Sequence, residues 1–119
     1  MQWTAHIRPA DLQQLIVNWE EQMPLKGTSG ERDYQPVVKL FNPMGAQTWL
    51  ITECDNDGLA FGLSDMGFGE AELGYVSLDE VFSVRLPGGL TIEQDIHFTA
   101  KHTLSEYAAK ARREGRITA

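Results

Sequence analysis

Three acidic side chains and one histidine have the residue types that a divalent metal site needs. Glu53, Asp65 and Glu72 fall at or near the ends of predicted strands, and His97 falls within a further one. Carboxylate oxygens are the ligands that Mg²⁺ and Mn²⁺ prefer, and such a metal can assist phosphodiester hydrolysis. These four residues are the candidate catalytic set if the protein is an enzyme, and Asp65, Glu72 and His97 are the candidate metal ligands.

The local pattern around these residues is weaker than that of an established metal motif. The sequence has neither a His-x-x-x-His pair nor paired cysteines. Glu93, Asp95 and His97 would share one face of an extended strand, but acids on a solvated strand face are common. We therefore expect no metal or other cofactor, with Mg or Mn as the alternative.

The glycine-rich stretch DMGFGEAELG, residues 65–74, raises the question of a phosphate-binding loop. A dinucleotide fingerprint requires a third glycine where Glu72 stands, and a P-loop requires a Lys-Ser/Thr step that is absent. Glu70 and Glu72 would also repel a phosphate. We interpret the stretch as a long hairpin turn with Phe68 at its tip, and we predict a protein-contact surface from the following residues: Phe68, Glu70, Glu72, Asp79 and Glu80.

The single cysteine does not support a nucleophile. Cys54 follows Glu53, whose negative charge raises the pKa of a thiol, and it lies in a predicted strand where a small buried apolar residue is the usual explanation. One cysteine also excludes an intramolecular disulfide, which together with the missing leader signal favours the cytoplasm.

The elements that position these residues follow from periodicity and turn chemistry. Apolar residues at three- and four-residue spacing predict a helix over residues 9–23, followed by a polar loop over 24–36. A β-rich core then spans residues 37–98. Its predicted strands are 37–41, 48–54, 59–65, 72–77 and 90–98, separated by turns rich in Pro, Gly, Asn and Asp.

Two capping boxes complete the pattern of elements. Ser77 with Glu80 predicts a short middle helix, and Thr103 with Glu106 predicts a C-terminal helix over 103–114, with Gly115 just past its end. We expect an α+β fold: a single domain over 1–119, with a mainly antiparallel sheet of four to five strands covered by helices on one face.

Charge and size limit the function classes. The chain has 119 residues and a formal net charge of −7, with a pI near 4.8. A basic groove for nucleic acid is hard to assemble from this composition, so we do not expect direct nucleic-acid binding. No apolar run approaches the roughly 18 residues that cross a bilayer, so we expect no membrane span.

Four sequence blocks carry a resemblance to a known family. The runs KLFNPMGAQTWLITE, AFGLSDMGFGEAELGYVSLDE, IEQDIHF and LSEYAAKAR, within about residues 37–112, resemble the DUF2958 family. The resemblance implies a small uncharacterised bacterial protein carried on plasmids and other mobile elements. The resemblance also implies a candidate activity, that of a single-stranded DNA endonuclease. The residues of this sequence that match the family and could serve that activity are Glu53, Asp65, Glu72 and His97.

Two function hypotheses follow. The first is a non-enzymatic acidic protein of a mobile element that binds a host nucleic-acid-processing or defence complex and antagonises it, as an anti-CRISPR or anti-restriction protein does. Its partner would be a protein with a basic nucleic-acid-binding groove. The alternative is a divalent-metal-dependent single-stranded DNA endonuclease. The charge balance favours the first.

Overall fold

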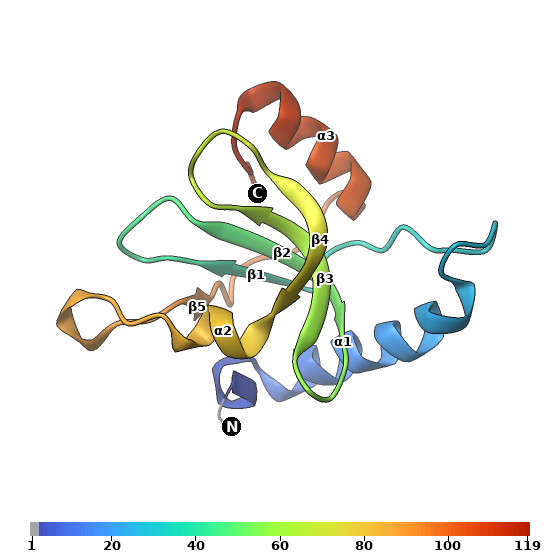
Figure 1. The fold of residues 1–119 in the computed structure, drawn as a ribbon, viewed down its shortest axis with the longest axis horizontal. Coiled ribbons are helices and arrows are strands. Elements are labelled where there is room, and N and C mark those ends of the chain that lie inside the picture. The colour runs from blue at the N-terminus through green and yellow to red at the C-terminus, as the bar shows by residue number, and fades with distance from the viewer. Residues whose placement is uncertain (1–2) are drawn as a thin grey trace.

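Five antiparallel strands form the sheet on which the other elements pack (Figure 1). The computed structural model describes residues 3–119. The sheet order is β4-β3-β2-β1-β5, and the strands are β1 Val38–Phe41, β2 Thr48–Cys54, β3 Leu59–Asp65, β4 Glu72–Ser77 and β5 Glu93–Gln94. The predicted α+β fold with a mainly antiparallel sheet is confirmed.

The first four strands form an antiparallel meander, in which the predicted turns join consecutive strands. Between β2 and β3, Gly58 has a φ of 90°, and the Asp55 side chain accepts hydrogen bonds from the backbone N–H groups of Asp57 and Leu59. Between β3 and β4, Gly67 and Gly69 have φ values of 90° and 88°. These positive φ values are the conformations that glycine adopts without strain.

Three helices begin and end at the predicted signals. They are α1 Pro9–Gln22, α2 Leu78–Ser83 and α3 Leu104–Glu114. Ser77 Oγ accepts from the N–H of Glu80 at the start of α2, and Thr103 and Glu106 form a reciprocal capping box at the start of α3. Short 3₁₀ turns lie at Trp3–His6 (η1), Met23–Leu25 (η2) and Pro87–Gly89 (η3).

The helices cover both faces of the sheet, so the prediction of one covered face is wrong. Figure 1 shows α1 and α3 on opposite sides of the strands. Leu50 and Ile51 are neighbours on β2 and point to different cores: Ile51 packs with residues of α1 and α2, whereas Leu50 packs with residues of α3. The capping box predicted the C-terminal helix, but local signals did not specify the sheet face on which it packs.

The segment between α1 and β1 is held by side-chain hydrogen bonds. The amide of Gln22 donates to the carbonyl of Arg32 and accepts from its N–H. Asp33 accepts from both the backbone and the hydroxyl of Ser105, and the N–H of Leu104 donates to the carbonyl of Tyr34. These hydrogen bonds hold the predicted loop against both the end of α1 and the start of α3.

The fifth strand is much shorter than the predicted 90–98. Only Glu93 and Gln94 pair with β1, because the Asp95 side chain accepts from the N–H of His97 and turns the chain. This local hydrogen bond competes with strand pairing. The predicted shared strand face of Glu93, Asp95 and His97 is therefore wrong. No helix within residues 3–119 is long and apolar enough to span a bilayer.

Candidate functional site

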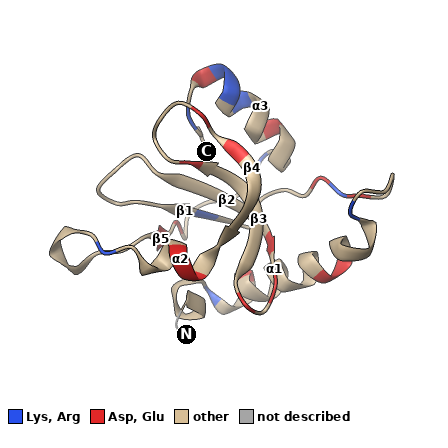
Figure 2. Cartoon of the chain, in the orientation of Figure 1, with Lys and Arg blue, Asp and Glu red and all other residues tan. Residues whose placement is uncertain are grey.

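The predicted contact residues gather along the β3–β4 hairpin and the start of α2. Phe68 lies in the connection between β3 and β4, and its side chain is 87% exposed. Glu70 and Glu72 follow it, and Asp79 and Glu80 lie in the first turn of α2; all four acids are exposed. Figure 2 shows acidic residues on β4 and α2, whereas Lys and Arg gather at the C-terminal end of α3.

An apolar hollow lies between β4 and α2. It has a volume of about 520 Å³ and is lined by the following residues: Trp49, Ser64, Met66, Glu72, Leu73, Gly74, Tyr75, Val76, Ser77, Glu80, Val81 and Val84. Its only charged lining residues are acidic. Gly74 adds no side chain to the strand surface here, and a Cβ at this position would meet no atom within 4 Å.

The outer edge of β4 is unpaired in the described sheet. Natural sheets usually protect such an edge with lysine, proline or a bulge, because free N–H and C=O groups attract another strand. β4 has the sequence ELGYVS and pairs with β3 in unbroken register. Leu73 is 45% exposed and Tyr75 is 53% exposed, so both side chains are accessible at this edge. We call the set of Met66, Phe68, Glu70, Glu72, Leu73, Tyr75, Asp79, Glu80 and Val84 the β4 surface.

The candidate metal residues do not converge. Thr48 pairs with Asp65 at one end of the β2–β3 hairpin, and Glu53 pairs with Phe61 near the other end. Glu53 is five positions after Thr48 along β2, which corresponds to roughly 16 Å at about 3.3 Å per residue. Glu72 lies on the strand face opposite to Asp65, because its cross-strand neighbour is Ser64.

His97 lies beyond the sheet edge opposite to the one that carries Glu72. It is exposed in the turn after β5, and β5 lies at the sheet edge opposite to β4. Within residues 3–119, no group of three or more His, Cys, Asp or Glu side chains is placed to hold a metal ion. The predicted Asp65, Glu72 and His97 cluster is therefore not formed.

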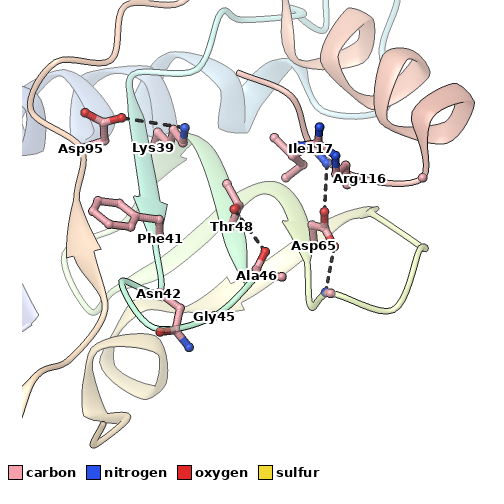
Figure 3. A pocket seen from close by; sticks show the side chains of 12 residues that line it. Lys39, Phe41, Asn42, Gly45, Ala46, Thr48, Asp65, Asp95, Arg116 and Ile117 are labelled. Atoms are coloured by element: carbon pink, nitrogen blue, oxygen red, sulfur yellow. Dashed lines mark hydrogen bonds and ion pairs between the residues drawn. The ribbon is translucent and has the colours of Figure 1, made fainter. Parts of the chain in front are cut away.

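Asp65 instead ties the chain together (Figure 3). It is 2% exposed, and its two oxygens accept from the N–H groups of Gly67 and Ile117, each at 2.9 Å. These bonds fix the β3–β4 connection and the C-terminal segment on one another. The cavity of about 560 Å³ beside them is also lined by Lys39 and Asp95, whose charged groups are 3.8 Å apart. Asp65 has the geometry of a structural residue.

Glu53 lies in a different setting, created by a β-bulge. Ile51 pairs with Gly62 and Glu53 pairs with the next residue, Phe61, so Thr52 is the extra residue on β2. The bulge turns Glu53 away from the α1 core, where strict alternation would place it, and onto the face that carries Phe61. A Cβ on Gly62 would lie 2.1 Å from the carbonyl oxygen of Leu50, so the bulge requires glycine opposite it.

Glu53 and Lys26 meet beside a third cavity. The Glu53 side chain is 2% exposed, and its Oε2 lies 3.9 Å from Lys26 Nζ. Burial raises the pKa of the Glu53 carboxyl, opposed by the Thr52 hydrogen bond and the Lys26 charge. Lys26, Thr52 and Phe61 were not among the site residues predicted from the sequence. The signal that was present is Gly62 inside a strand pattern, which indicates a bulge or a close backbone approach.

Cys54 has the expected structural role. It is buried against the α1 core, and burial together with the nearby Asp55 charge raises the pKa of its thiol to about 12. A thiol with this pKa is almost entirely protonated at neutral pH and is a poor nucleophile.

Comparison with known proteins places the chain in a family. No curated protein and no solved structure matched it significantly. Residues 7–118, which are nearly the whole chain, match the family described as "Protein of unknown function (DUF2958)". Because this match covers nearly the whole chain, the protein belongs to the DUF2958 family.

Proposed function

We propose that this protein is a small acidic cytoplasmic interaction protein that binds a basic protein partner through the β4 surface. The observation that carries the proposal is the combination of exposed apolar and acidic side chains there. Met66, Phe68, Leu73, Tyr75 and Val84 make up five of the ten large apolar side chains that are exposed on the described chain. Four of them, Met66, Leu73, Tyr75 and Val84, line the hollow between β4 and α2, and an exposed apolar area with a polar rim is typical of an interaction site.

The charge of the β4 surface supports a partner of positive charge. Glu72 and Glu80 line the hollow, and neither Lys nor Arg lines it. Glu70 and Asp79 extend the acidic rim. Complementary charge steers association and rejects partners of like charge. A second copy of this chain is disfavoured as the partner, because each copy has a formal net charge of −7.

The unpaired edge of β4 supports an extended partner segment. Such a segment gains main-chain hydrogen bonds by adding as a further strand, and its alternate side chains enter pockets on either face. On one face the hollow beside Trp49 and Val81 receives an apolar side chain. Basic side chains of the same segment would lie near Glu72 and Glu80.

Basic segments of this kind occur in proteins that bind nucleic acid. The partner we propose is therefore a host nucleic-acid-processing or defence complex, and occupation of its basic surface antagonises it, in the manner of an anti-restriction or anti-CRISPR protein. The support for this step is the net charge of −7 and the mobile-element setting that the family resemblance implies.

Affinity capture with charge-matched variants tests the proposal. One variant replaces Glu70, Glu72 and Glu80 by glutamine at the β4 surface. The control replaces Glu20, Glu93 and Glu114, three exposed glutamates located elsewhere, so both variants have the same net charge. Capture from bacterial lysate is followed by identification of the bound protein and by calorimetric titration of the purified partner at several salt concentrations.

We expect the wild-type chain and the control to capture a nucleic-acid-binding complex, with affinity falling as salt rises. The β4 variant should bind at least about tenfold more weakly, because each lost charge contact at an interface reduces association. Equal weakening by both variants would show that only net charge matters and would contradict a localised site. The endonuclease alternative is not carried forward, because its carboxylates and histidine do not converge in residues 3–119.

A further inference from the structure

The cavity beside Glu53 is built around a buried carboxylate. It has a volume of about 370 Å³ and is lined by Gln22, Lys26, Glu31, Arg32, Asp33, Tyr34, Thr52, Glu53, Phe61, Leu73, Leu104 and Ser105. Glu53 belongs to the rigid sheet, and the bulge that turns it into this cavity requires Gly62. A glutamate is almost never this buried unless it is paired.

The pairing of Glu53 is incomplete. Its Oε1 accepts from Thr52 Oγ1 at 2.7 Å, whereas Oε2 receives no hydrogen bond from any residue in 3–119. The nearest cationic group to Oε2 is Lys26 Nζ at 3.9 Å, beyond hydrogen-bond distance. One oxygen of a nearly inaccessible carboxylate is therefore available to a donor in the cavity.

Two aromatic rings stand next to the Lys26 ammonium group. Phe61 and Tyr75 are cross-strand neighbours, with ring centroids 5.2 Å apart. Lys26 Nζ lies 3.9 Å from the centroid of Phe61 and 5.4 Å from that of Tyr75. Aromatic faces attract cations through the ring quadrupole. We name the set of Glu53, Phe61, Tyr75 and Glu31 the ammonium cage.

The ammonium group that occupies the cage donates no hydrogen bond to any residue in 3–119. Besides the two rings, the neighbours of Lys26 Nζ are Glu53 and Glu31, whose Oε2 atoms lie 3.9 and 3.8 Å away. Three of the four cage residues belong to the sheet or its bulge, whereas Lys26 follows η2 in the segment before β1. The cation therefore comes from the segment before β1, as does Glu31, whereas Glu53 and both rings come from the sheet.

We propose that the cage is a binding site for a primary ammonium group, and that Lys26 occupies it in the free protein. The ammonium of a ligand would take the position of Lys26 Nζ and donate to Glu53 Oε2. An anion is disfavoured by the two carboxylates. A divalent metal is disfavoured because the cage contributes only two carboxylates, fewer ligands than Mg²⁺ or Ca²⁺ takes from a dedicated protein site.

The ammonium could come from a free alkylamine or from a lysine of a partner. Tyr75 and Leu73 connect the cage to the exposed edge of β4, so a basic segment bound there could place a lysine in it. The lysine source rests on the proposed function, whereas binding of a free alkylamine is independent of it.

Chemical rescue tests the site. Lys26→Ala empties the cage, and n-butylammonium chloride is then added, with potassium chloride at equal ionic strength and n-butanol as the uncharged match. Binding is followed by NMR signals of Leu73 and Leu104 and by the melting temperature. We expect n-butylammonium to bind with a dissociation constant on the order of 1 mM, the range for so small a ligand, and to raise the melting temperature.

Two variants make the result specific. Lys26→Met fills the cage with an uncharged side chain, which the amine would have to displace. This variant should therefore bind the amine at least about tenfold more weakly than Lys26→Ala, a difference of about 1.4 kcal/mol. Lys26→Ala combined with Glu53→Gln should lose the same factor. If Lys26→Ala does not fold, the wild-type chain serves instead: n-butylammonium should shift the Leu73 signals in wild type and leave them unchanged in Glu53→Gln.

A blocked Ala-Lys-Ala peptide distinguishes the two sources of the ammonium. Binding to Lys26→Ala more tightly than n-butylammonium, with loss on replacement of the peptide lysine by norleucine, would assign the site to a partner's lysine. Binding no tighter than the free amine would assign it to small amines. Absence of binding by both probes, or binding that Glu53→Gln leaves unchanged, would overturn the cage, whereas the capture experiment at the β4 surface would be unaffected.

Discussion

Asp65 and Glu53 are two buried carboxylates near opposite ends of the β2–β3 hairpin, and they are satisfied in different ways. Each is 2% exposed. Both oxygens of Asp65 accept from backbone N–H groups. Glu53 accepts one hydrogen bond from Thr52 and otherwise faces an ammonium at 3.9 Å beside a cavity. The backbone saturates one carboxylate and leaves the other with an available oxygen.

The difference separates a structural charge from a binding charge. Backbone donors cannot leave without unfolding the segments that carry them, so Asp65 fixes the β3–β4 connection to the C-terminal segment. The donor near Glu53 is a flexible side chain, which another cation can replace. A buried acid is therefore informative about binding only when its partners are known, and its burial alone is not enough.

The largest expected effect is that of Asp65→Ala. This change leaves the N–H groups of Gly67 and Ile117 without their acceptor, and each unsatisfied buried group costs about 1–3 kcal/mol. We expect the free energy of unfolding to fall by about 4 kcal/mol, measured by urea denaturation. Asp57→Ala, at an exposed turn position, is the control and should change it by less than about 0.5 kcal/mol. A small effect of Asp65→Ala would refute its structural role.

Gly62→Ala should have the next largest effect. The new Cβ would lie 2.1 Å from Leu50 O, so the bulge that orients Glu53 must distort, at a cost of about 3 kcal/mol. The cross-strand partner Gly74 provides a matched control, because a Cβ there meets nothing within 4 Å. Gly74→Ala should be neutral or stabilise by about 0.5 kcal/mol. Equal melting temperatures for the two variants would argue against the bulge.

Thr52→Val tests the single hydrogen bond of Glu53. The substitution keeps the shape and removes the donor to Oε1, and a hydrogen bond to a charged group contributes about 1.5–3 kcal/mol. We expect a loss of about 1.5 kcal/mol at neutral pH, and a smaller loss at acidic pH, where the carboxyl is protonated. Thr48→Val, at a half-buried position, should be nearly neutral. A loss that does not depend on pH would assign the effect to packing.

The smallest effect is the pH dependence contributed by Glu53. Because burial raises its pKa in the folded state, the folded protein binds this proton more tightly than the unfolded chain. The free energy of unfolding should therefore fall as pH rises above the ordinary glutamate pKa of about 4.3, with a slope of at most about 1.4 kcal/mol per pH unit. The decrease stops once the pH exceeds the pKa of Glu53 in the folded protein.

Glu53→Gln should lack this decrease, so its stability relative to wild type should improve as pH rises through that interval. Denaturation of both proteins across the acidic range measures the difference. A difference that stays constant with pH, or one that changes in the opposite direction, would show that Lys26 outweighs burial at this carboxyl.

Local sequence signals predicted most of the fold. The first four strands match within a residue, because each hairpin turn carries glycine or asparagine where the backbone needs it. The caps at Ser77 and Thr103 set the starts of α2 and α3. The fifth strand failed because its apolar alternation continues through Asp95, whereas the Asp95 side chain turns the backbone. Alternation reports which face is apolar and does not report whether a partner strand is present.

The candidate site was predicted only in part. The position of Phe68 at the tip of the hairpin turn followed from the two glycines beside it, and the acids of the β4 surface were identified from the hairpin and the start of α2. The predicted metal cluster was not formed. A position near a strand end does not by itself specify at which end of the sheet, or on which face of it, the side chain lies. A single bulged residue, Thr52, reversed the face of Glu53, and strict alternation cannot reveal that change.

The sequence alone determined the strands of the meander, the helix ends, the acidic charge and the buried character of Cys54, because these depend on neighbours within a few residues. Only the tertiary structure decided that helices cover both sheet faces, that the edge of β4 stays open, and that Asp65 and Glu53 have different roles. Those outcomes depend on Ile117 and Lys26, which lie 52 and 27 residues away in the chain from the carboxylates they contact. Contacts at such separations are fixed by packing, and local periodicity does not record them.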